Sequence, residues 1–314
     1  MDQIFNELSA NCCYESRYSA NSGIERLLKL VTDMNKIGYT QQLRTTRDFR
    51  QLEIAPQYRI NDWVYDRNDW VDRDFQRRLL TFVAKSPYVE DILDKSQQDL
   101  VNEFTFNGYN ACGLGLAYLW GSCTLSLDGD SRFANDRISL RFYQIDDTRE
   151  LDEIVQVINV ATSDHILANS DTLRNCFVKE IINGSKLLEQ SERLFPNLSF
   201  SQKAQKQLLE LTGSEQYFQE IVRHIKVLNE TMKSWSNGPF EPQGITWNPE
   251  SEPTLNQYAT TRQFKCSDGV VRLFSYHSKL MSANKRIHFY PITEHHIVHI
   301  GYVGDHLPTP TYKT

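Results

Sequence analysis

The sequence lacks the features of membrane, disulfide-rich or disordered chains. No C-x-x-C pair occurs among its six cysteines, which excludes zinc-finger and thioredoxin spacing. Its longest uncharged stretch, residues 104–127, is interrupted by glycine and asparagine, so no lipid-spanning helix is expected. Only 14 Gly and 10 Pro occur in 314 residues, beside 16 Phe, 15 Tyr and 5 Trp. This composition excludes a collagen-like or low-complexity chain and indicates an ordinary globular protein.

The length and the N-terminal residues set expectations for organisation and location. A chain of 314 residues is long enough for two domains. The first 20 residues carry Asp2 and Glu7 and contain no apolar stretch, so we expect no secretory signal. A cytoplasmic protein with buried free thiols is therefore expected.

Charge and histidine are unevenly distributed along the chain. The formal net charge is −6, but residues 1–184 hold 20 Lys+Arg against 28 Asp+Glu, a net of −8. Residues 185–314 hold 14 against 12, a net of +2, and seven of the eight histidines. Imidazole suits proton transfer near neutral pH. We therefore expect any chemistry to lie in the C-terminal part.

The N-terminal part is predicted to be a mixed α+β domain over residues 1–175. Apolar residues at three- and four-residue spacing predict a helix over 23–37, with Ser22 as its N-cap. Further helices are predicted over 71–85 and, more weakly, 96–106, and strands over 116–127 and 137–143. The acidic stretch 145–184 has the character of a connection, and we place the domain boundary within 165–185.

The C-terminal part, residues 185–314, predicts a small α+β domain. A short strand over 197–200 is followed by a helix capped by Ser201 and a longer helix that runs from Ser214 to Trp235. Four strands complete the pattern, at residues 260–266, 270–277, 286–290 and 297–303. The turn at 267–269 joins the first two as a hairpin. The predicted order is a short strand, two helices and an antiparallel meander.

The segment 274–308 holds the densest group of reactive side chains. Because alternate residues of a strand share a face, Arg286, His288 and Tyr290 are expected to line up opposite Ile287 and Phe289. On the last strand, alternation places His299 and Val303 on one face and Ile300 and Tyr302 on the other. Basic residues, histidine and tyrosine without a carboxylate cluster suit cleavage of RNA through its own 2′-hydroxyl, which needs no metal.

Three stretches, LSFSQKAQKQLLEL, HSKLMSANKRIHF and HHIVHIGYVGDHLP, resemble the RelE/HigB-type bacterial toxin endoribonucleases. The resemblance covers about residues 195–312 and implies a RelE-like fold. In it, Arg286 occupies the phosphate-binding position and His306 the C-terminal acid/base position. Lys279, His277 and Lys285 match the basic residues that precede that arginine. No glutamate matches the base that some members use, so His277 and His288 are both candidates for the general base.

The predicted RNA contacts extend beyond the catalytic residues. Lys285, Arg272, Tyr290 and Tyr302 are expected to bind RNA, and neither a metal nor another cofactor is expected. The resemblance implies RNA, in free or ribosome-bound form, as a partner, with an antitoxin or trigger protein as another. The sequence is compatible with a monomer and with an oligomer. No membrane partner is expected.

These observations lead to one preferred hypothesis and two alternatives. The preferred one is a metal-independent endoribonuclease, a RelE-like toxin or phage-defence effector, restrained or targeted by its acidic N-terminal domain. The first alternative is a non-catalytic interaction module that uses the same fold to bind a protein or RNA. The second is a DNA- or tRNA-modifying enzyme. His295 and His296 are expected on an exposed turn, and His299 in the core.

Overall fold

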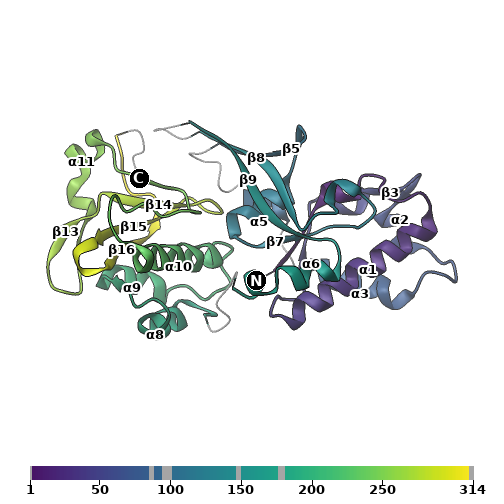
Figure 1. The fold of residues 1–314 in the computed structure, drawn as a ribbon, viewed down its shortest axis with the longest axis horizontal. Helices are drawn as coiled ribbons and strands as arrows, with labels where there is room; N and C mark the ends of the chain where they lie inside the picture. The colour runs from purple at the N-terminus through teal and green to yellow at the C-terminus, as the bar shows by residue number, and fades with distance from the viewer. Residues whose placement is uncertain (1, 85–87, 94–100, 146–149, 176–180, 311–314) are drawn as a thin grey trace. The chain divides into compact units, whose positions relative to one another are not determined.

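The structure is a computed structural model that describes residues 2–84, 88–93, 101–145, 150–175 and 181–310. The chain divides into two compact units, unit 1 (Met1–Phe177) and unit 2 (Val178–Thr314), and this division falls within the stretch 165–185. Both units combine helices and strands, which confirms the α+β class (Figure 1). Within the described ranges, no helix combines the length and the apolar character needed to cross a membrane.

Unit 1 is built on a seven-stranded mixed sheet with the order β2-β1-β7-β9-β8-β5-β6. The strands from β2 to β9 in this order run parallel to one another, and those from β9 to β6 are antiparallel. The carboxyl ends of β2, β1, β7 and β9 therefore meet at one edge of the sheet. The strands are β1 (Gln3–Phe5), β2 (Leu43–Arg44), β5 (Val101–Phe106), β6 (Tyr109–Asn110), β7 (Cys123–Leu125), β8 (Arg137–Ile145) and β9 (Glu150–Val160).

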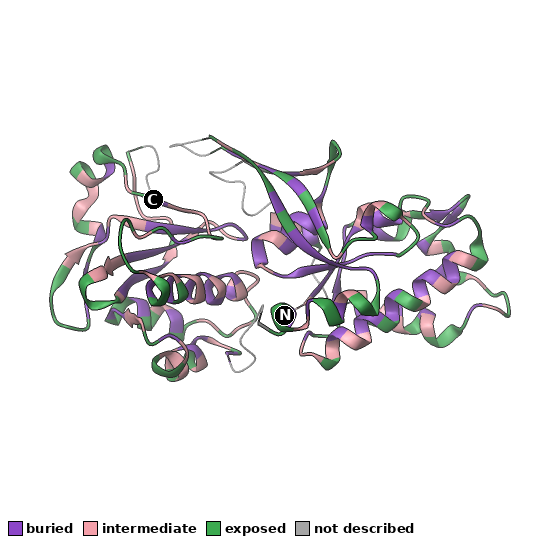
Figure 2. Ribbon diagram, viewed as in Figure 1, coloured by how far each residue is buried: buried purple, intermediate pink, exposed green. Residues whose placement is uncertain are grey.

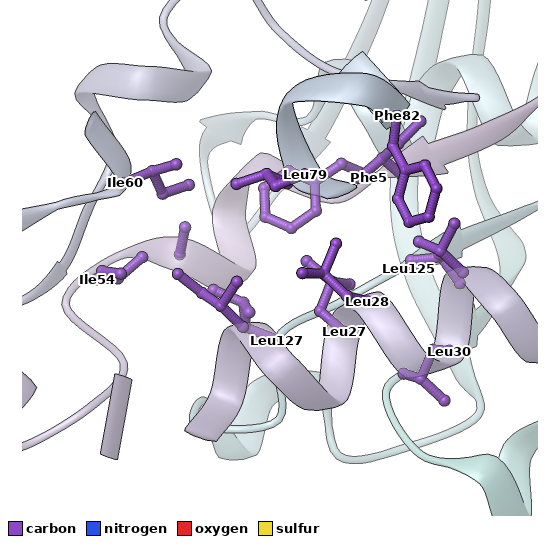
Figure 3. Close-up of a cluster of buried hydrophobic side chains, with 14 of the residues drawn as sticks. Phe5, Leu27, Leu28, Leu30, Ile54, Ile60, Leu79, Phe82, Leu125 and Leu127 are labelled. Atoms are coloured by element: carbon purple, nitrogen blue, oxygen red, sulfur yellow. The ribbon is translucent and has the colours of Figure 1, made fainter. Parts of the chain in front are cut away.

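Helices pack on this sheet and form its core. Helix α1 carries the buried side chains Leu27, Leu28 and Leu30. Figure 3 shows Leu27 and Leu28 on the side of α1 that faces side chains from the sheet and from α3, including Phe5 and Phe82. The helices of unit 1 are α1 (Arg17–Lys36), α2 (Ile60–Tyr65), α3 (Arg73–Val83), α4 (Val89–Leu93), α5 (Cys112–Trp120), α6 (Ser163–Ala168) and α7 (Ser170–Asn175). Short elements are η1 (Glu7–Ala10), η2 (Phe49–Gln51), η4 (Ser131–Phe133) and the hairpin of β3 (Glu53–Ala55) and β4 (Tyr58–Arg59).

The predicted first helix is present but begins earlier than expected. Ser16, not Ser22, is its N-cap, because the Ser16 hydroxyl accepts a hydrogen bond from the backbone N–H of Ser19 at 3.2 Å. The Ser19 hydroxyl in turn accepts from the N–H of Ser16, so the two serines form a reciprocal cap. The second predicted helix is also present, as α3, with residue 85 outside the described ranges.

Three other predictions for unit 1 were wrong. Of the helix predicted over 96–106, residues 96–100 lie outside the described ranges and residues 101–106 form strand β5. Phe104 of β5 stacks on Phe142 of β8 with ring centroids 4.8 Å apart. Of the strand predicted over 116–127, residues 116–120 belong to helix α5, because a short apolar run fits a buried helix as well as a buried strand, and only residues 123–125 form a strand, β7. The supposed connection contains β9, which pairs with β7 on one side and β8 on the other.

Unit 2 is a five-stranded sheet with helices on one face. The strand order is β10-β16-β15-β14-β11, with β10 parallel to β16 and the other pairs antiparallel. Its strands are β10 (Leu198–Phe200), β11 (Trp247–Pro249), β14 (Tyr276–Leu280), β15 (Lys285–Ile292) and β16 (Ile297–Asp305). Its helices are α8 (Gly184–Leu194), α9 (Gln202–Leu209), α10 (Phe218–Ser234) and α11 (Glu252–Tyr258), with the turns η5 (Ala259–Arg262) and η6 (Thr293–His295).

The predicted order of elements in unit 2 is largely present. Ser201 is the N-cap of α9, as expected, because its hydroxyl accepts from the N–H of Ala204 at 3.0 Å. Helix α10 begins at Phe218 and not at Ser214, which lies in a turn with Thr212. The run 270–277 is divided between β13 (Val271–Leu273), which pairs only with β12 (Gln263–Lys265), and β14 of the main sheet.

A β-bulge changes the faces of the last strand. Ile287 and Phe289 point into the helix-side core as predicted, and Ile300 lies there too. Val303 was expected on the opposite face from Ile300, but it lies in the same core. The β15–β16 register shifts between His288 and Phe289, which inserts one residue on β16 and reverses the alternation beyond it.

Candidate active site

The antiparallel register of β14 and β15 brings four predicted catalytic residues together. His277 lies directly opposite His288, and Lys279 lies directly opposite Arg286. Because directly opposite residues share a face, these four side chains form one group, which we call the histidine–arginine face. The ring centroids of His277 and His288 are 5.5 Å apart. This face lies on the side of the sheet away from α8, α9 and α10.

A carboxylate that the sequence analysis did not select lies at the centre of this face. Glu250 follows the edge strand β11, and its backbone N–H donates to the carbonyl of Ser275 at 2.7 Å. Its Oε1 atom lies 2.9 Å from Nε of Arg262, 3.2 Å from Nδ1 of His277 and 3.7 Å from Nδ1 of His288. Glu250 therefore joins the two histidines to a buried arginine.

Burial sets the protonation of this group at neutral pH. Burial opposes ionisation of Glu250, but the contact with His277 and the neighbouring positive charge outweigh it and lower the pKa of the carboxyl to about 2. Burial likewise lowers the pKa of His277 and, more strongly, that of His288. Burial and the charge of Arg286 lower the pKa of His306 to about 3. The Glu250 carboxylate is thus charged, and His277 and His288 are neutral at neutral pH and can act as proton acceptors.

The histidine–arginine face is covered, which corrects the expectation of a cationic face open to ligands. The exposed fraction is 1% for His288, 3% for Arg286 and 5% for Lys279. Figure 2 shows buried residues along β14 and β15. Residues 259–274, which comprise η5, β12, β13 and Phe274 and which we call the cover, pack on this side. Phe264 of the cover lies 6.4 Å from the ring of His288, between centroids, and stacks on Tyr302.

Two features hold the cover in place. Arg262 donates from Nη1 to the carbonyl of Pro308 at 2.9 Å, which links the cover to the segment after β16. At Gly301, a Cβ atom would lie 2.6 Å from the side chain of Phe264 and 2.7 Å from that of Phe274. Only glycine at this bulge lets both aromatic rings approach the sheet.

The predicted RNA-binding residues lie around the face but do not form one surface. Lys285 binds Asp305 at 2.7 Å, and Arg272 binds Asp268 at 2.7 Å, so a carboxylate engages each cation. Tyr302 is 8% exposed and packs between Phe264 and His288, whereas Tyr290 is half-buried beside the cover. In this conformation, these four side chains do not present an open, cationic track for RNA.

The remaining histidines lie away from the face. His295 and His296 are exposed on the turn between β15 and β16, and His299 is buried on β16 opposite Tyr290. On the other side of the sheet, Nδ1 of His224 lies 3.0 Å from the hydroxyl of Ser278, and its Nε2 lies 3.8 Å from Glu220.

This serine–histidine–glutamate group is structural. Ser278 and Glu220 are 0% exposed, and Glu220 accepts hydrogen bonds from the backbone N–H groups of Met281 and Ser282. A nucleophilic serine must reach its substrate, which the burial of Ser278 prevents. The group instead fixes the turn after β14 to α10.

Glu250 and Arg262 are the site residues that the sequence did not identify. Both lie outside the histidine-rich segment 274–308. Arg262 falls in the strand predicted over 260–266, but it ends the turn η5, and β12 begins only at Gln263. The edge strand β11, which positions Glu250, was not predicted. The one feature of the sequence that indicates an edge strand next to Glu250 is Pro249, since proline within a sheet is confined to edge strands and strand ends.

The comparisons with known proteins give no family for this chain. Neither the protein-family models, nor the curated proteins, nor the solved structures contain a match. Among the described residues, no three or more His, Cys, Asp and Glu side chains are grouped so that they could hold a metal ion.

Acid is expected to destabilise unit 2, starting near pH 6.5. His224, His277, His288 and His306 all have a lowered pKa in the folded state, so the unfolded state takes up protons first. Stability is fully present above pH 6.5 and is lost as the pH falls below it. His306 alone is expected to contribute a loss of about 2 kcal/mol at pH 5. Thermal unfolding of the full chain between pH 7.5 and 5 measures this effect.

A His306→Asn variant separates the contribution of His306 to acid destabilisation from that of the other ionisable groups. The groups that influence His306 are His277, Arg286, Glu250 and Arg262, and all four remain in the variant. As the pH is lowered, the stability of His306→Asn is expected to fall less steeply than that of the wild type. The control His295→Asn, a change at an exposed histidine, is expected to show the same dependence of stability on pH as the wild type. An unchanged slope for His306→Asn would contradict the prediction.

Proposed function

We propose that the chain is a metal-independent endoribonuclease whose reaction takes place at the histidine–arginine face of unit 2. The observation that supports this proposal is the register of β14 and β15, which pairs His277 with His288 and Lys279 with Arg286. Two neutral imidazoles beside a guanidinium and an ammonium group suit the chemistry of RNA cleavage. The RelE-like character of this unit remains part of the proposal.

The proposed reaction uses the ribose 2′-oxygen as the nucleophile. A neutral histidine, His277 or His288, removes the proton of the 2′-hydroxyl while the oxygen attacks the adjacent phosphorus. The bond from phosphorus to the 5′-oxygen breaks, and that oxygen takes a proton from His306. The products are a 2′,3′-cyclic phosphate and a 5′-hydroxyl, with no water or metal consumed.

Charge near the phosphate makes the acid role of His306 chemically reasonable. In the unliganded chain its pKa of about 3 leaves it unprotonated at neutral pH. A bound phosphodiester adds negative charge beside the imidazole, and nearby negative charge raises a histidine pKa. Arg286 and Lys279 are the proposed phosphate-binding groups. Access to the face requires the cover to move, because His288 is 1% exposed.

A chimeric oligonucleotide tests the mechanism directly. The full chain is incubated in EDTA with a DNA strand that contains one ribonucleotide, and we expect cleavage only on the 3′ side of that residue. The new 5′ end should accept phosphate from a polynucleotide kinase, as a 5′-hydroxyl does. His306→Gln is expected to slow cleavage about 100-fold.

The matched control for this assay is His295→Gln, because His295 is an exposed histidine outside the face. It is expected to retain the wild-type rate. Cleavage of an all-DNA strand, products with a 5′-phosphate, or equal rates for the two histidine variants would each contradict the proposed reaction.

The burial of the face favours a second candidate, a non-catalytic interaction module. A face of which His288 is 1% exposed and Arg286 3% exposed contributes to the interior of unit 2 and does not contact a partner in this conformation. Under this reading, RNA or protein would bind elsewhere on the unit. Binding of the chimeric strand without any cleavage would support this candidate over the enzyme.

The role of unit 1 is also a proposal. Its acidic character, a net of −8 over residues 1–184, suits a domain that restrains or targets a basic nuclease. A toxin or phage-defence effector in the cytoplasm is the biological setting that this arrangement supports.

A further inference from the structure

Unit 1 contains a cavity at the edge of the sheet where the parallel strands end. Its volume is about 520 Å³, within the range of small-molecule sites. Residues just after β1 and β2, among them Glu7 and Thr46, line it together with residues from α4, β6 and the start of α5. The carboxyl ends of parallel strands are the usual position for ligand sites in such sheets.

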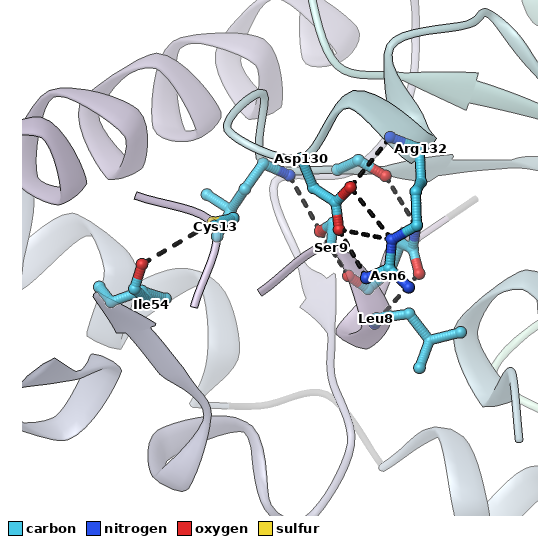
Figure 4. Close-up of polar contacts among 9 residues, drawn as sticks. Asn6, Leu8, Ser9, Cys13, Ile54, Asp130 and Arg132 are labelled. Atoms are coloured by element: carbon cyan, nitrogen blue, oxygen red, sulfur yellow. Dashed lines mark hydrogen bonds and ion pairs between the residues drawn. The ribbon is translucent and has the colours of Figure 1, made fainter. Parts of the chain in front are cut away.

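Hydrogen bonds link the strands at the sheet edge beside this cavity. The side chain of Asn6 donates to the hydroxyl of Ser126 at 2.9 Å, and Ser126 donates to Asn159 at 2.6 Å. The hydroxyl of Ser9 donates to the carbonyl of Asn6 at 2.6 Å and accepts from the N–H of Leu127 at 3.0 Å. Figure 4 shows Asn6 and Ser9 beside the Asp130–Arg132 pair. These hydrogen bonds join the ends of β1, β7 and β9 next to the residues that line the cavity.

Two polar atoms of the wall have unused hydrogen-bonding capacity. Oε1 of Glu7 is buried and has no hydrogen-bond partner among the described residues, while Oε2 accepts from the N–H of Gly113 at 2.9 Å. Thr46 is 3% exposed, and its Oγ1 atom likewise has no partner within the described part of the chain. Buried polar atoms are normally satisfied, so these two atoms are expected to pair with water or with a ligand that fills the cavity.

The charges around the cavity are mostly negative. Its lining includes four carboxylates, from Glu7, Asp48, Glu53 and Glu90. Arg132, the one basic residue among the described residues that line it, binds both carboxylate oxygens of Asp130 at 2.6–3.1 Å (Figure 4). Arg132 is thus already paired with Asp130, which is not one of the four carboxylates that line the cavity.

We infer that this cavity binds a small organic cation that carries a guanidinium or primary ammonium group. Such a group can donate to Oε1 of Glu7 and to Oγ1 of Thr46, and its charge complements the four carboxylates. Tyr109, which also lines the cavity, offers an aromatic ring for a cation. Among the described residues, these carboxylates do not form a group that could hold a metal ion. The site is separate from the proposed ribonuclease site, which lies in unit 2.

Calorimetric titration of the full chain with agmatine and with putrescine tests this inference. Agmatine carries a guanidinium group as well as an ammonium group, and putrescine carries two ammonium groups, so the pair distinguishes the two cation types. Glutarate, an anion of comparable size, is expected not to bind. Saturable binding of at least one of the two cations is expected, with Glu7→Gln weakening it at least tenfold at pH 8.

Two further variants keep the test decisive. Asp48 is exposed, so Asp48→Asn is expected to fold normally and to weaken binding about threefold. Glu153 lies on β9 outside the cavity and is exposed, so Glu153→Gln is the matched control with unchanged binding. Failure of both cations to bind, equal binding of glutarate, or binding unaffected by Glu7→Gln and Asp48→Asn would overturn the inference.

Discussion

Replacing Glu250 by glutamine is expected to destabilise unit 2 by about 3–5 kcal/mol. The side chain of Glu250 is 5% exposed, and its carboxylate lies 2.9 Å from Nε of Arg262, whose side chain is 1% exposed. Glutamine keeps the size of the side chain but leaves the buried guanidinium without its counter-charge. Removing one partner of a buried ion pair costs more than the pair contributes, because the remaining charge stays desolvated. Guanidinium chloride unfolding of the full chain measures the change.

The control for this prediction is Glu252→Gln, two residues along the chain. Glu252 is exposed in the first turn of α11 and is expected to change stability by less than about 0.5 kcal/mol. A double variant, Glu250→Gln with Arg262→Met, is expected to lose less than the sum of the two single changes, because it removes both charges. If Glu250→Gln and Glu252→Gln were equally stable, Glu250 would not anchor the cover.

The sequence predicted the strand residues of the candidate site much better than the residues that pack over them. Alternation along β15 correctly placed Arg286 and His288 on one face and Ile287 on the other, because this pattern depends only on strand geometry. The burial of that face was not predictable, since it depends on how residues 259–274 fold back over the sheet. Glu250 reaches the site through the same non-local arrangement.

Local signals also separate the correct element predictions from the wrong ones. Ser201 was identified as a cap because a capping serine acts within one turn of its helix. The acidic stretch at 150–160 was taken for a connection, yet β9 is held between β7 and β8, and its exposed Asp152 pairs with Arg141. A strand with one solvated face carries charged residues, and only its neighbours identify it as a strand.

The cavity in unit 1 shows how topology creates a site that no motif announces. Glu7, Asp48 and Glu90 are separated by about 40 residues at each step along the chain. The parallel pairing of β1 with β2 brings the first two to one edge, and α4 brings the third. In the sequence, these residues are ordinary acidic residues in polar stretches.

Glu7 is expected to make the stability of unit 1 fall as the pH rises from about 4.5 to 7. Burial raises the pKa of its carboxyl to about 7, and the nearby charge of Asp48 acts in the same direction. Below pH 4.5 the carboxyl is protonated in both the folded and the unfolded state. Between 4.5 and 7 only the unfolded state loses the proton, so folding becomes less favourable. The full loss above pH 7 is about 3 kcal/mol.

A Glu7→Gln variant isolates this effect, because its side chain is uncharged at every pH. Its amide oxygen can still accept a hydrogen bond from the N–H of Gly113. Residue 113 must be glycine for this close approach, because a Cβ atom there would lie 2.2 Å from the carbonyl oxygen of Phe5. The other ionisable groups close to Glu7, which are Asp48, Glu90 and Cys112, are retained. The variant is therefore expected to gain about 3 kcal/mol relative to the wild type between pH 4 and pH 8 in urea unfolding. Glu153→Gln, exposed on β9, should show no such gain, and a constant difference between Glu7→Gln and the wild type at all pH values would contradict the raised pKa.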